Sequence, residues 1–162
     1  MENKQNNQII FENAHIFWRN FAGKEAKFNP AGRRNFCLEI PKEIVDKMRE
    51  DGWNIKTIPP KDEDGSPLNY IQVGVAFGQY PPKVWLISGK SKTLLDEDAV
   101  ASLDYAEIQN VDLIIRPYTW EVRGEKGIKA YLKKIYVTVV QDDLEMKYRN
   151  LTEDDDDVPW VE

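Results

Sequence analysis

The chain has 162 residues, of which 41% are hydrophobic and 31% charged, which is the size and composition of one globular domain. It has no run of the ~20 apolar residues that a membrane helix needs, residues 1–8 are too polar for a signal peptide, and its single cysteine excludes a disulfide within the chain. The formal net charge of −6 arises at one end, because residues 153–162 hold six acids and no base while the rest has 22 acids against 22 Lys and Arg. We therefore expect a cytoplasmic protein with a neutral body and an acidic tail.

Most of the predicted elements are strands. Six segments are rich in branched and aromatic residues and are bounded by Gly, Pro, Asn or Asp, which is typical of short strands. Two helices are expected as well: residues 41–52, with Pro41 in the first turn and Gly52 at the end, and a shorter one over residues 96–105. Short strands with one or two helices favour a mainly β fold, a small antiparallel barrel. The predicted strands are residues 8–21, 35–40, 69–77, 83–88, 111–122 and 128–140.

Residue types that carry catalysis or bind metals are scarce. His15 is the only histidine and Cys37 the only cysteine, so neither a Ser-His-Asp triad with a spare base nor a His and Cys zinc site can be assembled. Cys37 lies in an apolar run and is expected to be a small buried hydrophobe. We predict no catalytic residue, no metal site and no cofactor, although carboxylates alone can hold magnesium, so a magnesium-dependent nuclease stays an alternative.

Aromatic and basic residues alternate on two of the late strands. Arg116, Tyr118 and Trp120 are two apart, as are Lys129, Tyr131 and Lys133, so each set lies on one face of its strand. Residues 123–127 indicate a hairpin loop. If the strands pair so that Trp120 lies near Tyr131 and Tyr118 near Lys133, the ribbon has three rings and three cations on one face. Such a ribbon can stack the bases of single-stranded nucleic acid on its rings and attract phosphates with its cations. The alternative is that the rings pack inside the barrel.

A second basic tract lies earlier in the chain. Residues 17–36, FWRNFAGKEAKFNPAGRRNF, join two predicted strands through a loop and carry five bases against one acid. Loops that flank the groove of a small barrel are where such folds bind oligonucleotides. The predicted helix over residues 41–52 has four acids against three bases, so it is not a recognition helix for duplex DNA. Single strands are therefore the expected ligand.

These tracts resemble a known family. Residues 17–36, the segment VDLIIRPYTWEVRGEKGIKAYLKKIYVTV and the acidic tail together are similar to the single-stranded DNA-binding proteins of bacteriophages and prophages. The resemblance implies an OB fold, which is a five-stranded barrel, and a non-catalytic protein that coats single-stranded DNA during replication or recombination. It also implies a bacterial host cell as the location. An acidic protein that mimics DNA and occupies a DNA-binding enzyme stays open beside it.

The tail is similar to that of bacterial single-stranded DNA-binding proteins, in which a final Phe docks on replication and repair enzymes. Here Trp160 stands in place of that Phe, and Val161 and Glu162 follow it. We expect residues 1–151 to form the OB-fold domain and residues 152–162 to be a disordered tail that recruits partners and competes with DNA. The tail residues assigned to partner binding are Asp154, Asp155, Asp156, Asp157, Pro159 and Trp160.

The sequence thus predicts single-stranded DNA as the main partner, replication or recombination proteins as partners of the tail, and no membrane contact; homo-oligomerisation stays open. The predicted nucleic-acid-binding residues are Arg19, Phe21, Lys24, Lys27, Arg33, Arg34, Lys90, Lys92, Arg116, Tyr118, Trp120, Arg123, Lys126, Lys129, Tyr131 and Lys133.

Overall fold

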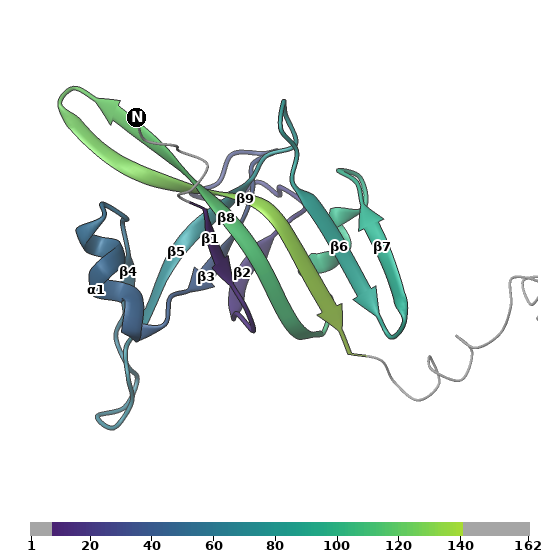
Figure 1. The fold of residues 1–162 in the computed structure, drawn as a ribbon, viewed down its shortest axis with the longest axis horizontal. Coiled ribbons are helices and arrows are strands. Elements are labelled where there is room, and N and C mark those ends of the chain that lie inside the picture. The colour runs from purple at the N-terminus through teal and green to yellow at the C-terminus, as the bar shows by residue number, and fades with distance from the viewer. Residues whose placement is uncertain (1–7, 141–162) are drawn as a thin grey trace, which may run out of the picture.

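The computed structural model describes residues 8–140, which form one sheet curled into a barrel, with a helix at its side (Figure 1). The predicted tail, residues 152–162, lies outside these residues. Among the described residues the elements are β1 (Ile9–Phe11), β2 (Ile16–Asn20), β3 (Arg34–Glu39), α1 (Lys42–Glu50), β4 (Lys56–Ile58), β5 (Leu68–Val75), β6 (Lys83–Ser88), β7 (Ser91–Leu95), the 3-10 helix η2 (Val100–Asp104), β8 (Ile108–Val122) and β9 (Glu125–Val139).

The sheet closes on itself through five segments of the chain. Its strand order is β1-β8-β9-β5-β3-β2, and β1 and β2 belong to one segment that bends over residues 12–15. Because the first half of that segment pairs with β8 and the second half with β3, the two ends of the order meet. This circuit confirms the predicted mainly β, OB-like fold.

Two features differ from a purely antiparallel five-stranded barrel. The structure has nine strands within residues 8–140, because β4 pairs with the edge of β5 and the β6–β7 hairpin is an addition. The sheet is also mixed, since β9 runs parallel to both β5 and β6. A long connection between β5 and β9 permits a parallel pairing, whereas the sequence showed only the short turns that favour antiparallel pairs.

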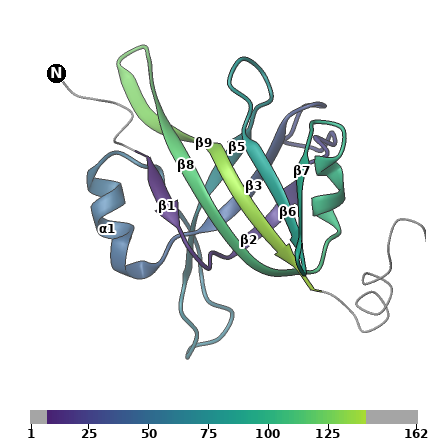
Figure 2. The same cartoon turned by 45° about the vertical axis from the view of Figure 1, so that its right-hand side comes forward.

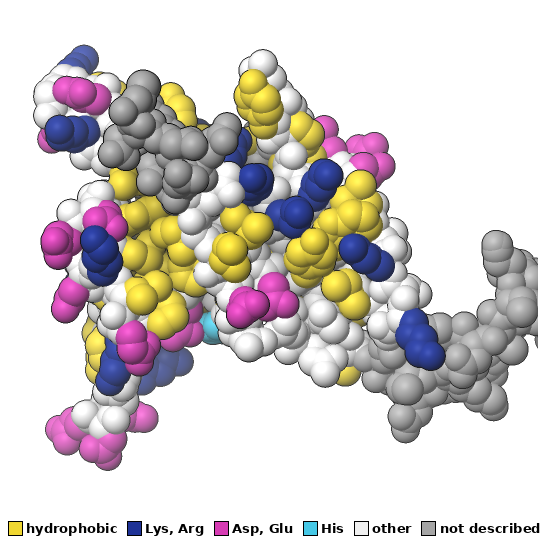
Figure 3. Space-filling model, viewed as in Figure 1, with side chains coloured by type: hydrophobic (Ala, Val, Ile, Leu, Met, Phe, Trp, Pro, Cys, Tyr) yellow, Lys and Arg dark blue, Asp and Glu magenta, His cyan; other side chains and the backbone are white. Residues whose placement is uncertain are grey.

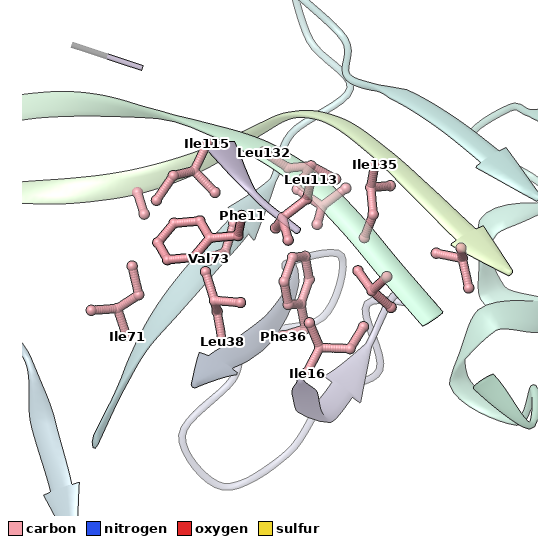
Figure 4. Packing of buried hydrophobic residues seen from close by; sticks show 14 of the residues in the cluster. Phe11, Ile16, Phe36, Leu38, Ile71, Val73, Leu113, Ile115, Leu132 and Ile135 are labelled. Atoms are coloured by element: carbon pink, nitrogen blue, oxygen red, sulfur yellow. The ribbon is translucent and has the colours of Figure 1, made fainter. Parts of the chain in front are cut away.

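The barrel interior is filled by alternate residues of the strands (Figure 4). On β8 the buried positions are Val111, Leu113 and Ile115, two apart as expected for a strand with one face inside. On β9 the spacing changes between Leu132 and Ile135, because the register with β8 shifts between Ile114 and Ile115. This β-bulge leaves Lys133 as the extra residue and lets both halves of β9 keep a face in the core.

Both helices among the described residues bury apolar side chains in the core. Helix α1 buries Val45 and Met48, starts after Pro41 and stops before Gly52, whose φ of +107° suits a glycine after a helix end. The first predicted helix is therefore confirmed. The second, over residues 96–105, is the short η2, which buries Val100 and Leu103. None of the helices in residues 8–140 is long and apolar enough to cross a membrane.

The β8–β9 hairpin reaches well beyond the barrel (Figures 1 and 2). Each strand has 15 residues, and the turn between them is only Arg123 and Gly124, with φ of +53° and +85°. Positive φ at both positions is the two-residue turn that matches the twist of a hairpin. The predicted loop over residues 123–127 was too long, since Glu125, Lys126 and Gly127 belong to β9.

Candidate nucleic-acid interface

The alternating rings and cations of the hairpin share one face of the ribbon. Arg116 pairs with Tyr131, Tyr118 with Lys129, and Trp120 with Gly127. Directly paired residues of antiparallel strands lie on the same side, so the predicted common face is present. The pairing of Trp120 with Tyr131 and of Tyr118 with Lys133 was wrong, because the actual partner of each residue lies four residues earlier on β9. The tight turn at residues 123–124 brings the strands together earlier than a five-residue loop would.

Two of these rings lie on glycines. The indole of Trp120 covers Gly127 so closely that a Cβ atom there would lie 2.9 Å from Cζ2, and the ring of Tyr131 covers Gly74 of β5, where a Cβ would lie 3.1 Å from Cε1. Tyr118 meets Tyr131 edge to face, with centroids 6.1 Å apart. The side chains of Tyr118 and Trp120 are 56% and 39% exposed, so the alternative that these two rings fill the barrel interior is wrong.

Cations surround the same rings. The guanidinium carbon of Arg116 lies 5.7 Å from the centroid of Tyr131, and the ammonium of Lys129 lies 5.1 Å from it. Both distances are in the range of a cation–π interaction. The face therefore combines exposed ring surface with positive charge, and both come from the paired strands β8 and β9.

The loop between β2 and β3 lies against this ribbon. A hollow of about 530 Å³ is lined by Arg33 and Arg34 from the loop side and by Lys129 and Tyr131 from β9, with Gly74 of β5 between them. The loop is shaped by Asn29, whose side-chain amide donates hydrogen bonds to the carbonyls of Lys24 and Arg33 at 2.9 and 3.0 Å and whose side-chain oxygen accepts one from Asn35 at 2.8 Å. The two basic tracts, some 80 residues apart in sequence, thus meet in one hollow.

A smaller hollow of about 190 Å³ continues the first, because Lys129 lines both. It lies between Trp120 and Gly127 of the ribbon and Lys56 and Gln72 of β4 and β5. We call the two hollows together the β5 groove. Strand β5 forms its floor, with Gln72 and Gly74 on the outward side.

Arg34 is the most constrained cation in the groove. Its Nη1 donates to Glu97 at 3.2 Å, and its guanidinium lies 5.6 Å from the centroid of Phe77. Its Nε is buried and has no hydrogen-bond partner among the described residues. A buried N–H without a partner costs about 1–3 kcal/mol.

A third hollow of about 550 Å³ lies between the β8–β9 strands and the chain that leads into β6. Lys83, Arg116, Lys133 and Lys134 line it together with Tyr80, and no acid does. We call it the basic hollow; its neighbourhood over β9, β6 and β7 shows basic side chains among hydrophobic ones (Figure 3). Lys133 reaches it through the β9 bulge.

Lys92 lies apart from all three hollows, its ammonium 4.4 Å from the Trp85 ring and 5.5 Å from the Tyr136 ring. Lys90 is exposed at the turn of the β6–β7 hairpin.

Two predicted residues have structural roles instead. Phe21 is 0% exposed and stacks on Phe36 at 5.3 Å, so the prediction that it contacts nucleic acid is wrong. Arg19 is not assigned to the nucleic-acid interface either. Its Nη1 donates hydrogen bonds to the carbonyls of Leu103 and Ala106 at 2.7 and 2.9 Å, which hold η2 to β2. Both were assigned from the composition of the basic tract, whereas packing and a register shift in β2 between Phe17 and Asn20 decide which of its side chains are exposed.

The remaining predicted cations are exposed at the rims. The ammonium of Lys24 donates a hydrogen bond to the hydroxyl of Tyr105, which raises the pKa of that ammonium above its ordinary value, and Lys27 lies 5.4 Å from the ring of the exposed Phe28. Arg123 and Lys126 lie at the tip of the hairpin. The sequence missed residues that carry no alternating pattern. They are Lys56, Gln72 and Phe77 in the β5 groove and Tyr80, Lys83 and Lys134 in the basic hollow.

The sequence was compared with models of protein families. The model described as "Putative phage ssDNA-binding domain" matches residues 1–162. The chain belongs to this phage single-stranded DNA-binding domain family. The comparison with curated proteins found no match.

Solved structures from bacteriophage Enc34 agree with the fold of this family member. The single-stranded DNA-binding protein from bacteriophage Enc34 in complex with ssDNA aligns with a TM-score of 0.56 and 15% identity, over 88% of this chain and 94% of that one. The C-terminally truncated Enc34 protein aligns over the same shares with a TM-score of 0.55 and 15% identity. The single-stranded DNA-binding protein gp2.5 of bacteriophage T7 aligns less well, with a TM-score of 0.39 and 11% identity, over 90% and 96%.

Proposed function

We propose that this protein coats single-stranded DNA with little sequence preference, as a non-catalytic component of phage-type replication or recombination. The observation that carries the proposal is the β5 groove, where Arg33 and Arg34 face Lys129 and Tyr131 across the outward side of β5. Membership of the phage single-stranded DNA-binding domain family supports the same ligand.

The groove suits an unpaired strand because rings and cations alternate along it. Bases stack on Tyr118, Trp120 and Tyr131, each stack contributing ~1–3 kcal/mol, and any base offers a flat face for this. The phosphates lie toward Arg33, Arg34, Arg116 and Lys129. In a duplex the bases are stacked on one another and their faces are not available to the rings, so duplex DNA would keep only the phosphate contacts.

Helix α1 gives no support for duplex recognition. It carries Lys42, Lys47 and Arg49 against Glu43, Asp46 and Glu50, and one of its bases, Lys47, is paired with Asp51 at 3.3 Å. A recognition helix needs a basic face that enters the major groove, and α1 has no such excess of charge. The DNA-contacting surface is therefore assigned to the strands and the loop over residues 21–33.

We further propose that the acidic tail acts as a competitor of DNA and as a docking segment. Residues 153–162 carry six acids, the same sign of charge as DNA, and the β5 groove and basic hollow carry the complementary sign. DNA that displaces the tail would free Trp160 for an apolar pocket on a replication or recombination protein, with Pro159 limiting the conformational entropy cost of docking.

The test is a gel-shift titration with single-stranded and duplex oligonucleotides of matched sequence, with and without Mg²⁺. We expect tight binding of the single strand, weaker binding of the duplex and an intact oligonucleotide in both cases. Absence of binding at every salt concentration would favour an acidic protein that mimics DNA. Degradation of the single strand that stops on addition of a chelator would identify a magnesium-dependent nuclease.

A further inference from the structure

Four aromatic rings gather on β2, on the residue before it and on β5, away from the ribbon. Phe17 meets Trp18 and Tyr70 edge to face at 5.0 and 5.4 Å, Trp18 meets Tyr70 at 5.5 Å, and His15 stacks on Phe17 at 5.5 Å. Trp18 is nevertheless 62% exposed. Its indole is therefore held in place by two other rings while most of its surface faces solvent.

The backbone under Trp18 adopts an unfavourable conformation that turns this residue outward. Its φ is +48°, a left-handed value that is rare for a bulky residue, and it lies inside the register shift between Phe17 and Asn20. Strained backbone positions that a fold retains cluster at binding sites. Burial of the Trp18 side chain does not offset the cost of this backbone conformation, because the side chain is mostly exposed.

The ring cluster lies on the same side of the sheet as the β5 groove. Phe17 pairs with Cys37, and Cys37 pairs with Gln72, so the three share one face of β2, β3 and β5. Gln72 lines the groove beside Trp120, and Tyr70 precedes it by two residues on the same side of β5. Two strand spacings of ~4.8 Å separate β5, the floor of the groove, from β2, so the face extends the groove by about 10 Å.

The charges around the cluster favour a base over a phosphate. Glu39 pairs with Tyr70 in the sheet and its carboxylate is 2.9 Å from His15 Nδ1, so negative charge lies close to the rings. The nearest groove cation is Lys56, which pairs with Tyr70 from the other side and also lines the smaller hollow. A phosphate would thus be attracted at Lys56, while the rings offer a neutral flat surface.

We propose that Trp18, backed by Phe17 and Tyr70, is an additional base-stacking site for the single strand that occupies the β5 groove. This inference rests on the proposed function and lengthens its binding path across β5, β3 and β2. A strand long enough to pass Lys56 stacks a base on Trp18, and a shorter one occupies only the groove itself. Trp18 therefore contributes to the affinity only for oligonucleotides that are long enough to reach it.

The experiment measures the affinity for oligothymidines of increasing length, from about 4 to about 16 nucleotides, the range of site sizes of OB folds. The variants are Trp18→Ala, Trp18→Phe and, as the matched control, Trp85→Ala, whose indole lies on β6 under the Lys92 ammonium. We expect Trp18→Ala to lose about 5- to 150-fold in affinity for the long oligomers and nothing for the shortest one that binds. Trp18→Phe should retain most of the affinity, and Trp85→Ala all of it.

Several outcomes would overturn the inference without touching the proposed function. Trp18→Ala that binds every length like the unmodified protein would show that the rings do not contact the strand. An equal loss at all lengths, or a loss in Trp85→Ala of the same size, would show a structural effect. Failure of the unmodified protein to bind any oligothymidine would instead contradict the proposed function itself. Thermal unfolding of each variant checks that it is folded.

Discussion

Substituting Gly127 tests whether the orientation of the Trp120 ring matters for binding. A Cβ atom at position 127 would lie 2.9, 3.1 and 3.2 Å from Cζ2, Cε2 and Nε1 of the indole. Contacts between carbon atoms are optimal at about 3.5–4.0 Å, so Gly127→Ala must push the ring away from the strand by roughly 0.6–1 Å. The ring can move because Trp120 is 39% exposed.

The two effects of Gly127→Ala have opposite signs. Gly127 lies within β9 and does not have a positive φ, so alanine fits the backbone and restricts the unfolded chain, which stabilises by about 0.4–1 kcal/mol. The displaced ring loses part of the ~1–3 kcal/mol that a base stack contributes, for which we take about 1 kcal/mol, or roughly fivefold in affinity. Trp120→Ala should lose the whole stacking contribution.

Fluorescence anisotropy with a labelled oligothymidine measures the affinity, and urea unfolding measures the free energy of unfolding. Gly78→Ala is the matched control, because a Cβ there meets no atom within 4 Å and the residue lies in the loop between β5 and β6. We expect Gly127→Ala to be as stable as the unmodified protein or more so, and to bind more weakly. Unchanged affinity in both Gly127→Ala and Trp120→Ala would refute the role of this ring.

Three further predictions concern charge and the thiol. Replacing Arg33 and Arg34 with Ala should lower the slope of log affinity against log salt by about 0.7 for each phosphate that is no longer neutralised, and an unchanged slope would contradict their place at the groove. Burial raises the pKa of the Cys37 thiol to about 11, against 9.0 in its unperturbed state, so the thiol loses its proton at lower pH in the unfolded chain than in the folded one. The free energy of unfolding should therefore fall as the pH rises from about 9 to about 11. Urea titrations of Cys37→Ser should show a weaker dependence on pH over this range. Truncation after Leu151 should raise single-strand affinity at low salt, with a gain that vanishes at high salt, and equal affinities at low salt would remove the competition proposal.

Local patterns in the sequence were enough to predict the classes of element. Alternation of apolar residues marks β8 and β9, Pro41 and Gly52 bracket α1, and the mainly β composition with turn residues indicates a small barrel. The common face of Arg116, Tyr118 and Trp120 follows from a period of two alone. The burial of Cys37 was also predicted. Its side chain, however, lies on the outward face of β3, between its paired neighbours Phe17 on β2 and Gln72 on β5, and not in the core cluster.

Features that depend on register were not predictable from such patterns. Phe21 and Arg19 were misassigned because the composition of the basic tract does not show which of its side chains pack inside. The bulge after Phe17 exposes Trp18 and changes which of the following residues face the core. The bulge at Lys133 does the same on β9. A single extra residue reverses the side on which all later side chains lie, and nothing in the composition marks where it occurs. Contacts across the sheet decide it.

The contacts between the groove glycines and the rings could not be predicted from the sequence either. They explain how exposed rings can be held in the orientation that a ligand needs. Tyr131 lies on Gly74 and Trp120 on Gly127, so each ring rests against bare backbone instead of projecting freely. A side chain that is already held in its bound orientation loses less rotamer freedom on binding, where an immobilised side chain otherwise costs about 0.5–1.5 kcal/mol. Because the rings recognise only the flat face of a base, this gain is the same for every base. Rings fixed on glycine therefore strengthen binding without adding sequence preference, which is what a protein that coats arbitrary single strands requires.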